Sequence, residues 1–255
     1  ISIILIATAF FLSISCSEKV IENGGKETLR VDYIFSGNSL ESRISLSELI
    51  RFDGWAGRDV NRDKVALMGN GQIKSQKCIY RTSFSTLFQE WLATEEATKV
   101  DKSFENVFLL PMPERKATIT IELYNFYGQT MTSLTHEVDP EDILIRKLGG
   151  KPAPHKYLLN NGNSSEKIDI AIVAEGYTKD ERAKFYKDAQ IAMEAILSHK
   201  PFDQYRDRFN FVAVALESTE SGVSVPINGE WRESALNSHF STFYMDRYLT
   251  TLRLK

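Results

Sequence analysis

The feature that most restricts the fold is a strand, a capped helix and a second strand in the C-terminal half of the chain. Residues 168–174 form a short apolar run, and residues 209–216 include a longer one that suits a strand buried on both faces. Between them, Thr178 and Glu181 have the spacing of a capping box, so we expect a helix from there to about His199. This unit predicts two parallel strands and the beginning of an α/β domain.

Residues 27–146 show the alternation that is typical of antiparallel strands. Apolar and polar side chains alternate in residues 28–35 and again in residues 118–123. A turn that contains Gly128 leads to residues 130–138, where the alternation returns and predicts a hairpin. Several such strands favour a β-sandwich, so the fold class is expected to be α+β: an antiparallel β-sandwich followed by the start of an α/β domain.

The regions around these two parts are less regular. Gly, Pro and Asn are frequent in residues 147–167, which predicts a linker between the β-domain and residues 168–255. Residues 84–97 fit a helix and a strand equally well. Residues 241–255 carry apolar side chains at helical spacing without a capping residue, so we expect a helix that continues past Lys255.

The N-terminal residues have the character of a targeting segment. Residues 1–16 begin with an apolar run that is too short to span a bilayer, which predicts a signal peptide whose basic start is missing. Cys16 follows small residues after this run, as in a bacterial lipobox, and is the expected lipid attachment site. A plain secretory signal with an incidental cysteine is the alternative. Residues 17–26 form a polar spacer. We therefore expect a cell-envelope protein: an outer-membrane lipoprotein that is periplasmic or surface-exposed, or a secreted protein.

Charge and cysteine content narrow the partners further. The net charge is −3 and no basic stripe is present, so we expect no nucleic-acid partner. A membrane is an expected partner only through the lipid on Cys16. The second cysteine, Cys78, would then be unpaired, and its apolar neighbours predict a buried, inert thiol.

Residues that could carry chemistry are few. The four histidines are far apart in the sequence and none belongs to a His-Glu-x-x-His run: His136, His155, His199 and His239. We therefore predict no metal site within this chain. Ser224 follows Gly222 as in a nucleophile elbow, but Pro226 stands where that turn needs glycine, so a serine hydrolase is a third-ranked alternative.

Glu175 and Tyr177 follow the first parallel strand, at the sheet edge where ligands of open α/β sheets gather. They are candidates for lining a substrate cleft. The simpler interpretation is that they are polar loop residues at the entry of the helix.

Three segments carry a resemblance to a known family. Residues 169–178 (Asp-Ile-Ala-Ile-Val-Ala-Glu-Gly-Tyr-Thr), 228–240 and 244–249 resemble the IgA-specific zinc metallopeptidases of Bacteroides-type gut bacteria. The resemblance covers almost the whole chain. It implies a β-sandwich N-terminal domain, the opening of a metallopeptidase domain, and a zinc ion in the full-length parent. The family's zinc-binding His-Glu-x-x-His helix has no counterpart in these residues, so no catalytic or metal-binding residue is carried over.

Two functions rank ahead of the serine hydrolase. The leading hypothesis is an incomplete part of a secreted zinc endopeptidase that hydrolyses peptide bonds in a protein or peptide substrate. The alternative is a cell-envelope lipoprotein that binds protein or glycan through its β-domain.

Overall fold

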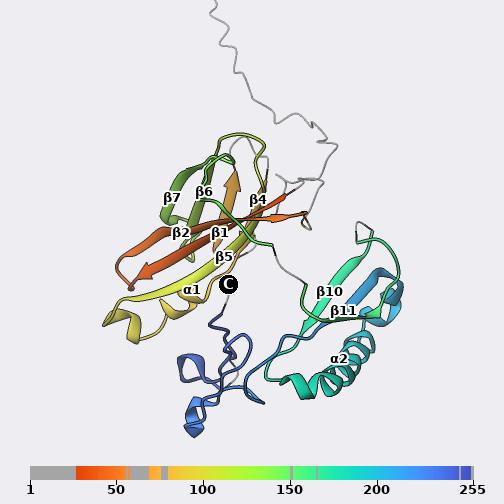
Figure 1. The fold of residues 1–255 in the computed structure, drawn as a ribbon. Coiled ribbons are helices and arrows are strands. Elements are labelled where there is room, and N and C mark those ends of the chain that lie inside the picture. The colour runs from red at the N-terminus through yellow and green to blue at the C-terminus, as the bar shows by residue number, and fades with distance from the viewer. Residues whose placement is uncertain are drawn as a thin grey trace, which may run out of the picture. The chain divides into compact units, whose positions relative to one another are not determined.

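The computed structural model describes the following parts of the chain: residues 27–55, 57, 69–75, 80–149, 152–164, 166–246 and 248–253. The predicted signal peptide, the spacer, Cys16 and Cys78 lie outside the described residues. The chain divides into two compact units, Ile1–Leu148 and Gly149–Lys255, which we call the N-terminal unit and the C-terminal unit (Figure 1).

The described residues of the N-terminal unit contain eight strands: β1 (Glu27–Gly37), β2 (Ser42–Asp53), β3 (Gly71–Ser75), β4 (Arg81–Phe84), β5 (Lys102–Pro111), β6 (Ala117–Tyr124), β7 (Thr130–Val138) and β8 (Arg146–Lys147). They form two sheets with the orders β5-β1-β2-β8 and β4-β3-β6-β7. All pairs are antiparallel except β2 with the two-residue strand β8.

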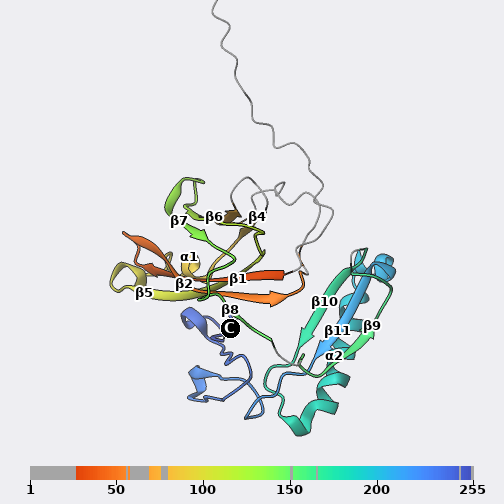
Figure 2. The ribbon, with the colours of Figure 1, turned by 45° about the horizontal axis from the view of Figure 1, so that its top comes forward.

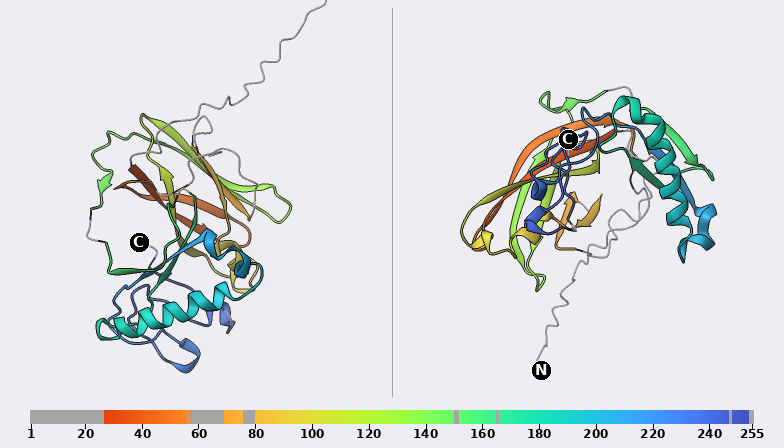
Figure 3. Two further views of the ribbon diagram at one scale, coloured as in Figure 1. Left: turned by 90° about the vertical axis from the view of Figure 1, so that its right-hand side faces the viewer. Right: turned by 90° about the horizontal axis from the view of Figure 1, so that it is seen from below.

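The two sheets face each other, as the contacts between them show (Figure 3). The Tyr33 hydroxyl of β1 lies 2.7 Å from Nε2 of His136 on β7. The ring of Phe35 on β1 stacks on Phe84 of β4 with centroids 6.2 Å apart. The β-sandwich and the α+β class that the alternation predicted are therefore confirmed.

The alternation of the sequence determines which side chains enter this core. In β6 every second residue is buried: Ala117, Ile119, Ile121 and Leu123. The hairpin with β7 forms as predicted, with Ile121 opposite Leu134. The undecided segment 84–97 contains the short helix α1 (Leu87–Trp91), followed by the 3₁₀ helix η2 (Glu96–Thr98), and α1 buries Phe88 and Trp91 against the sandwich.

The C-terminal unit contains the predicted strand–helix–strand unit. Strand β10 (Ile168–Val173) pairs in parallel with β11 (Phe209–Val214), and Ile170 stands opposite Phe211. The 3₁₀ helix η3 (Lys179–Glu181), helix α2 (Arg182–Leu197) and the 3₁₀ helix η4 (Phe202–Arg208) connect them.

The segment expected to be a linker differs from that expectation. Residues 147–167 include a further strand, β9 (His155–Leu159), which pairs antiparallel with β11. The sheet is therefore mixed, with the order β10-β11-β9. Gly, Pro and Asn flank this strand and do not fall within it.

Helix α2 packs along one face of this three-stranded sheet (Figure 2). Its buried residues recur every fourth position: Phe185, Ala189, Met193 and Leu197. They meet Phe211 and Ala213 of β11, which are fully buried. This face is therefore the core of the C-terminal unit.

The predicted C-terminal helix is wrong. The described residues from 241 to 253 contain only one turn of 3₁₀ helix, η6 (Thr242–Tyr244). Ser241, Phe243 and Tyr244 have φ of 61°, 54° and 61°, in the left-handed region that a right-handed helix excludes. The chain instead turns back, so that Thr250 pairs with His239 in an isolated bridge. Helical spacing alone did not reveal this reversal.

Among the described residues, no helix combines the length and the apolar character that crossing a membrane requires.

Candidate functional site

The loops that follow the two parallel strands, β10 and β11, lie at the same edge of the sheet. The loop after β10 contains Glu175, Gly176 and Tyr177, and the loop after β11 runs from Glu217 onward. Gly176 has φ of +76°, and a Cβ atom there would lie 2.6 Å from the carbonyl oxygen of Gly222. The position therefore requires glycine, because the two loop backbones approach closely.

Backbone hydrogen bonds join these loops along their length. The N–H of Gly222 donates to the carbonyl of Gly176 at 2.8 Å, and the N–H of Ser218 donates to the carbonyl of Tyr177 at 2.9 Å. The hydroxyl oxygen of the buried Ser218 accepts from the N–H of Gly176 at 3.0 Å and from that of Ala235 at 2.9 Å. The edge of the sheet is thus closed by one ordered pair of loops.

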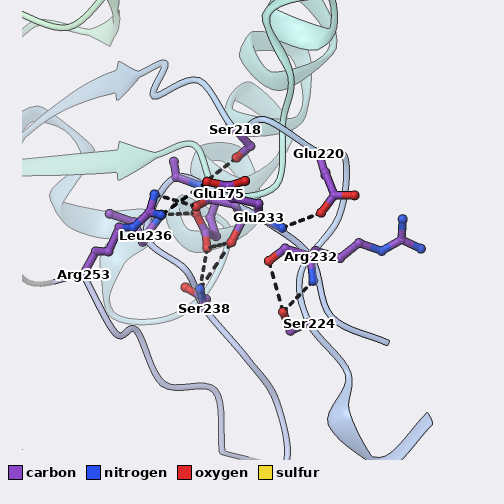
Figure 4. A network of polar contacts seen from close by, with 11 residues as sticks. Glu175, Ser218, Glu220, Ser224, Arg232, Glu233, Leu236, Ser238 and Arg253 are labelled. Carbon is purple, nitrogen blue, oxygen red and sulfur yellow. Dashed lines mark hydrogen bonds and ion pairs between the residues drawn. The ribbon is translucent and has the colours of Figure 1, made fainter. Parts of the chain in front are cut away.

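The carboxylate of Glu175 is the centre of this arrangement (Figure 4). Its Oε1 accepts from the hydroxyl of Ser234 at 2.5 Å and from the N–H of Ser238 at 2.9 Å. Its Oε2 accepts from the N–H of Leu236 at 2.8 Å. We call residues 232–238 the clasp loop, because Glu175 holds it against the end of β10.

The clasp loop is also held from its outer side. The carboxylate of Glu220 accepts from the N–H of Glu233 at 2.6 Å. Arg253 forms an ion pair with the carboxylate of Glu233 at 3.6 Å, and one of its guanidinium nitrogens donates to the carbonyl of Ser234 at 3.4 Å. These contacts bring together segments that are far apart in the sequence.

The electrostatics of Glu175 favour the ionised form. Partial burial alone would raise the pKa of its carboxyl group, but the bonds from Ser234, Leu236 and Ser238 together lower that pKa below its ordinary value. The group is therefore an anion at neutral pH, and its role in this structure is to accept hydrogen bonds from its own chain.

Tyr177 has a different set of partners. Its hydroxyl donates to the carboxylate of Asp188 on α2 at 2.9 Å, and its ring meets Phe185 edge-on with centroids 5.3 Å apart. The ammonium group of Lys184 lies 4.9 Å from the ring centroid. Partial burial, with the nearby Asp188 carboxylate, raises the pKa of Tyr177. Tyr177 is thus tied to the helix while Glu175 is tied to the clasp loop, and the substrate cleft proposed for them stays a prediction.

The serine-hydrolase alternative gains no support from the geometry. Ser224 is only 1% exposed, and its hydroxyl oxygen accepts from the N–H of Arg232 at 2.9 Å. Nδ1 of His239 lies 2.9 Å from the carbonyl oxygen of Phe240. Pro226, in place of the glycine of a nucleophile elbow, begins the 3₁₀ helix η5 (Pro226–Asn228).

No metal centre can be assembled from the part of the chain that the structure describes. It contains no group of three or more His, Cys, Asp or Glu side chains that could hold an ion. His136, which is partly buried, bonds to Tyr33 in the N-terminal unit. The described residues therefore do not fit a zinc site.

The partners of Glu175 were not identified from the sequence. Two of its three donors are backbone N–H groups, which every non-proline residue carries, so residue type gives no sign of them. Ser234 and Ser238 are four residues apart, a spacing without a motif.

Comparison with family models shows the family to which this chain belongs. The model described as Peptidase M64 N-terminus matches residues 22–135, and the model described as IgA Peptidase M64 matches residues 157–254. The chain belongs to the IgA peptidase M64 family, which confirms the resemblance to IgA-specific metallopeptidases. A search among curated proteins finds no match.

The family defines the general activity. Its members are metallopeptidases, so the chain belongs to a peptidase of the IgA-peptidase type, with a protein or peptide as its substrate.

Proposed function

We propose that the chain supplies the β-domain and the first part of the catalytic domain of a zinc-dependent endopeptidase of the cell envelope. The observation that carries the proposal is the match of the peptidase model to residues 157–254, which includes β10, β11, Glu175 and the whole clasp loop. In this proposal, the zinc ligands come from sequence outside these residues. A zinc ion held by those ligands would polarise the scissile carbonyl and activate water.

The role of the described residues is to shape one wall of the substrate cleft. In open α/β sheets, ligands bind beyond the carboxyl ends of the strands, which is where the clasp loop lies. Glu175 fixes that loop through three hydrogen bonds, so it acts as a positioning residue and not as an acid or base. The same proposal places the protein at the membrane through a lipid on Cys16, or free after secretion.

The first test is to sequence the locus beyond the codon for Lys255. An open frame that encodes His-Glu-x-x-His supports the proposal, and its product can then be assayed for bound zinc and for cleavage of casein and of IgA. Replacing the Glu of that motif should abolish cleavage without loss of zinc. An immediate stop codon would contradict the proposal that this gene encodes a zinc endopeptidase.

A polar pocket favours the second candidate function, binding of protein or glycan by the β-domain. It lies at the β1–β2 turn and the start of β5 and is lined by Ser36, Gly37, Asn38, Glu41, Arg43, Asp101, Lys102 and Ser103. Hydroxyl, amide and charged groups of both signs are suited to a polar ligand. Binding on a glycan array that the Lys102→Ala variant loses would support this function, and an array without signal would count against it.

A further inference from the structure

The turn between β6 and β7 presents two aromatic rings directly to solvent. Phe126 is 98% exposed and Tyr127 is 83% exposed, and Met131 nearby is 41% exposed. The two rings meet edge-on with centroids 5.7 Å apart. We call residues 125–131 the aromatic tip of the hairpin. Such large apolar surface costs free energy in water unless a partner covers it.

The turn beneath these rings is ordered by its own hydrogen bonds. The side-chain oxygen of Asn125 accepts from the N–H groups of Tyr127 and Gln129, both at 2.9 Å. The N–H of Gly128, a residue with φ of +75°, donates to the carbonyl of Asn125 at 2.9 Å. The rings are therefore held on a preformed support, and a partner that binds them does not have to order the backbone first.

The tip is also free of charge. No Asp, Glu, Lys or Arg occurs between Glu122 and Glu137, although such residues make up 25% of the chain. The Nδ2 group of Asn125 donates to Oε1 of Gln129 at 2.9 Å, so these two amide atoms are bonded within the turn. With no charged side chain beside the rings, this chemistry favours an apolar partner.

We propose that the aromatic tip inserts into the interfacial region of a phospholipid bilayer. Aromatic side chains concentrate at membrane–water interfaces, where the ring is buried and the phenol hydroxyl of Tyr127 stays hydrated. The absence of charge avoids the cost of burying an ion at that depth. This inference is independent of zinc chemistry and of a lipid on Cys16.

The test uses the full chain with a Cys16→Ser substitution, so that no lipid can be attached. Phe126→Trp is compared with Leu40→Trp, because Leu40 is 94% exposed on another turn of the same unit but is followed by the charged Glu41. Both proteins are mixed with phosphatidylcholine vesicles that contain brominated lipid. Quenching of the added fluorescence in F126W but not in L40W is expected. Equal quenching, or none in either, would overturn the proposal.

A second measurement gives the strength of the interaction. Phe126→Ser/Tyr127→Ser should weaken partition onto phosphatidylcholine vesicles about tenfold, because the interfacial burial of two rings is lost. Leu40→Ser should leave partition unchanged, and the apolar run in residues 1–12 adds the same background to every variant. All substituted side chains are exposed, so every variant should fold, and thermal melting checks that each one does. If the double variant loses affinity for a soluble protein or glycan and keeps its vesicle partition, the membrane role is excluded.

Discussion

Each of the two units is stabilised by a different kind of internal packing. In the N-terminal unit, two facing sheets and α1 enclose a cluster of rings whose neighbouring centroids lie between 4.6 and 6.4 Å apart: Phe35, Phe84, Phe88, Trp91, Phe104 and Phe108. In the C-terminal unit, one helix lies on one face of a three-stranded sheet, and small side chains fill much of the contact: Ala174, Ala189, Ala213 and Ala215.

The difference extends to the loops. Polar contacts hold the clasp loop of the C-terminal unit, with the Glu175 carboxylate at their centre and further contacts to Ser218, Glu220 and Arg253, whereas the strands of the N-terminal unit depend on apolar burial. Apolar contacts themselves do not titrate, so a pH effect in the N-terminal unit has to come from polar groups such as His136. A loop that is held around one carboxylate is expected to respond to a change of that single residue.

The largest effect should come from the aromatic core. Phe35→Ala should lower the free energy of unfolding of the N-terminal unit by about 3–5 kcal/mol, because a fully buried ring is lost and a cavity remains. Hydrogen exchange in urea, followed separately in β6 and β11, should show that only the N-terminal unit is affected. Leu40→Ala, at an exposed position, is the matched control with a change near zero. Equal destabilisation of both units would contradict the prediction that the two units unfold separately.

The next effect should be confined to the clasp loop. Glu175→Ala should lower the free energy of opening at the amides of Leu236 and Ser238 by about 2–3 kcal/mol, because hydrogen bonds to a charged group are lost. Hydrogen exchange of those amides measures this directly. Glu230→Ala removes a carboxylate that is half exposed and should leave them unchanged. Unaltered exchange in the Glu175 variant would mean that the loop is held by its backbone alone.

A pH effect should appear in the N-terminal unit. Burial lowers the pKa of His136, although its bond to the Glu137 carbonyl acts in the opposite direction. Below a pH of about 6.5, the unfolded chain takes up a proton before the folded one does, so stability falls as pH falls, by at most about 1.4 kcal/mol per pH unit. At higher pH both states are neutral and this contribution is absent. Urea titrations at several pH values measure the slope.

His136→Gln should reduce that slope, since glutamine can still accept from Tyr33 but does not titrate. His155→Gln, at an exposed position in the C-terminal unit, is the control. A slope that is the same in both variants would assign the acid sensitivity to other groups.

The smallest effect is expected at the start of α2. One carboxylate oxygen of Glu181 accepts from the N–H of Thr178 at 2.9 Å and the other from the hydroxyl of Ser221 at 2.9 Å. Glu181→Ala should therefore slightly lower the melting temperature of the C-terminal unit. Asp180→Ala, its exposed neighbour, should cost less, as judged by thermal melts of both variants. A larger loss at Asp180 would contradict the capping assignment.

Local sequence patterns were sufficient to predict most of the fold. Alternation in residues 118–123 predicted β6, and the capping residues Thr178 and Glu181 predicted the entry into α2. Both signals work because they depend on neighbours within a few residues. The sequence alone also predicted the family and the α+β class.

Only the tertiary structure decided the rest. Strand β9 forms because β11 offers it a free edge, and the segment 241–253 turns back because left-handed residues and a pairing with His239 oppose its helical spacing. The partners of Glu175 lie between 59 and 63 residues away along the chain. Two of these partners are backbone N–H groups, which nearly every residue carries. Residue type therefore does not indicate which N–H groups bond to Glu175, and only the folded chain determines it.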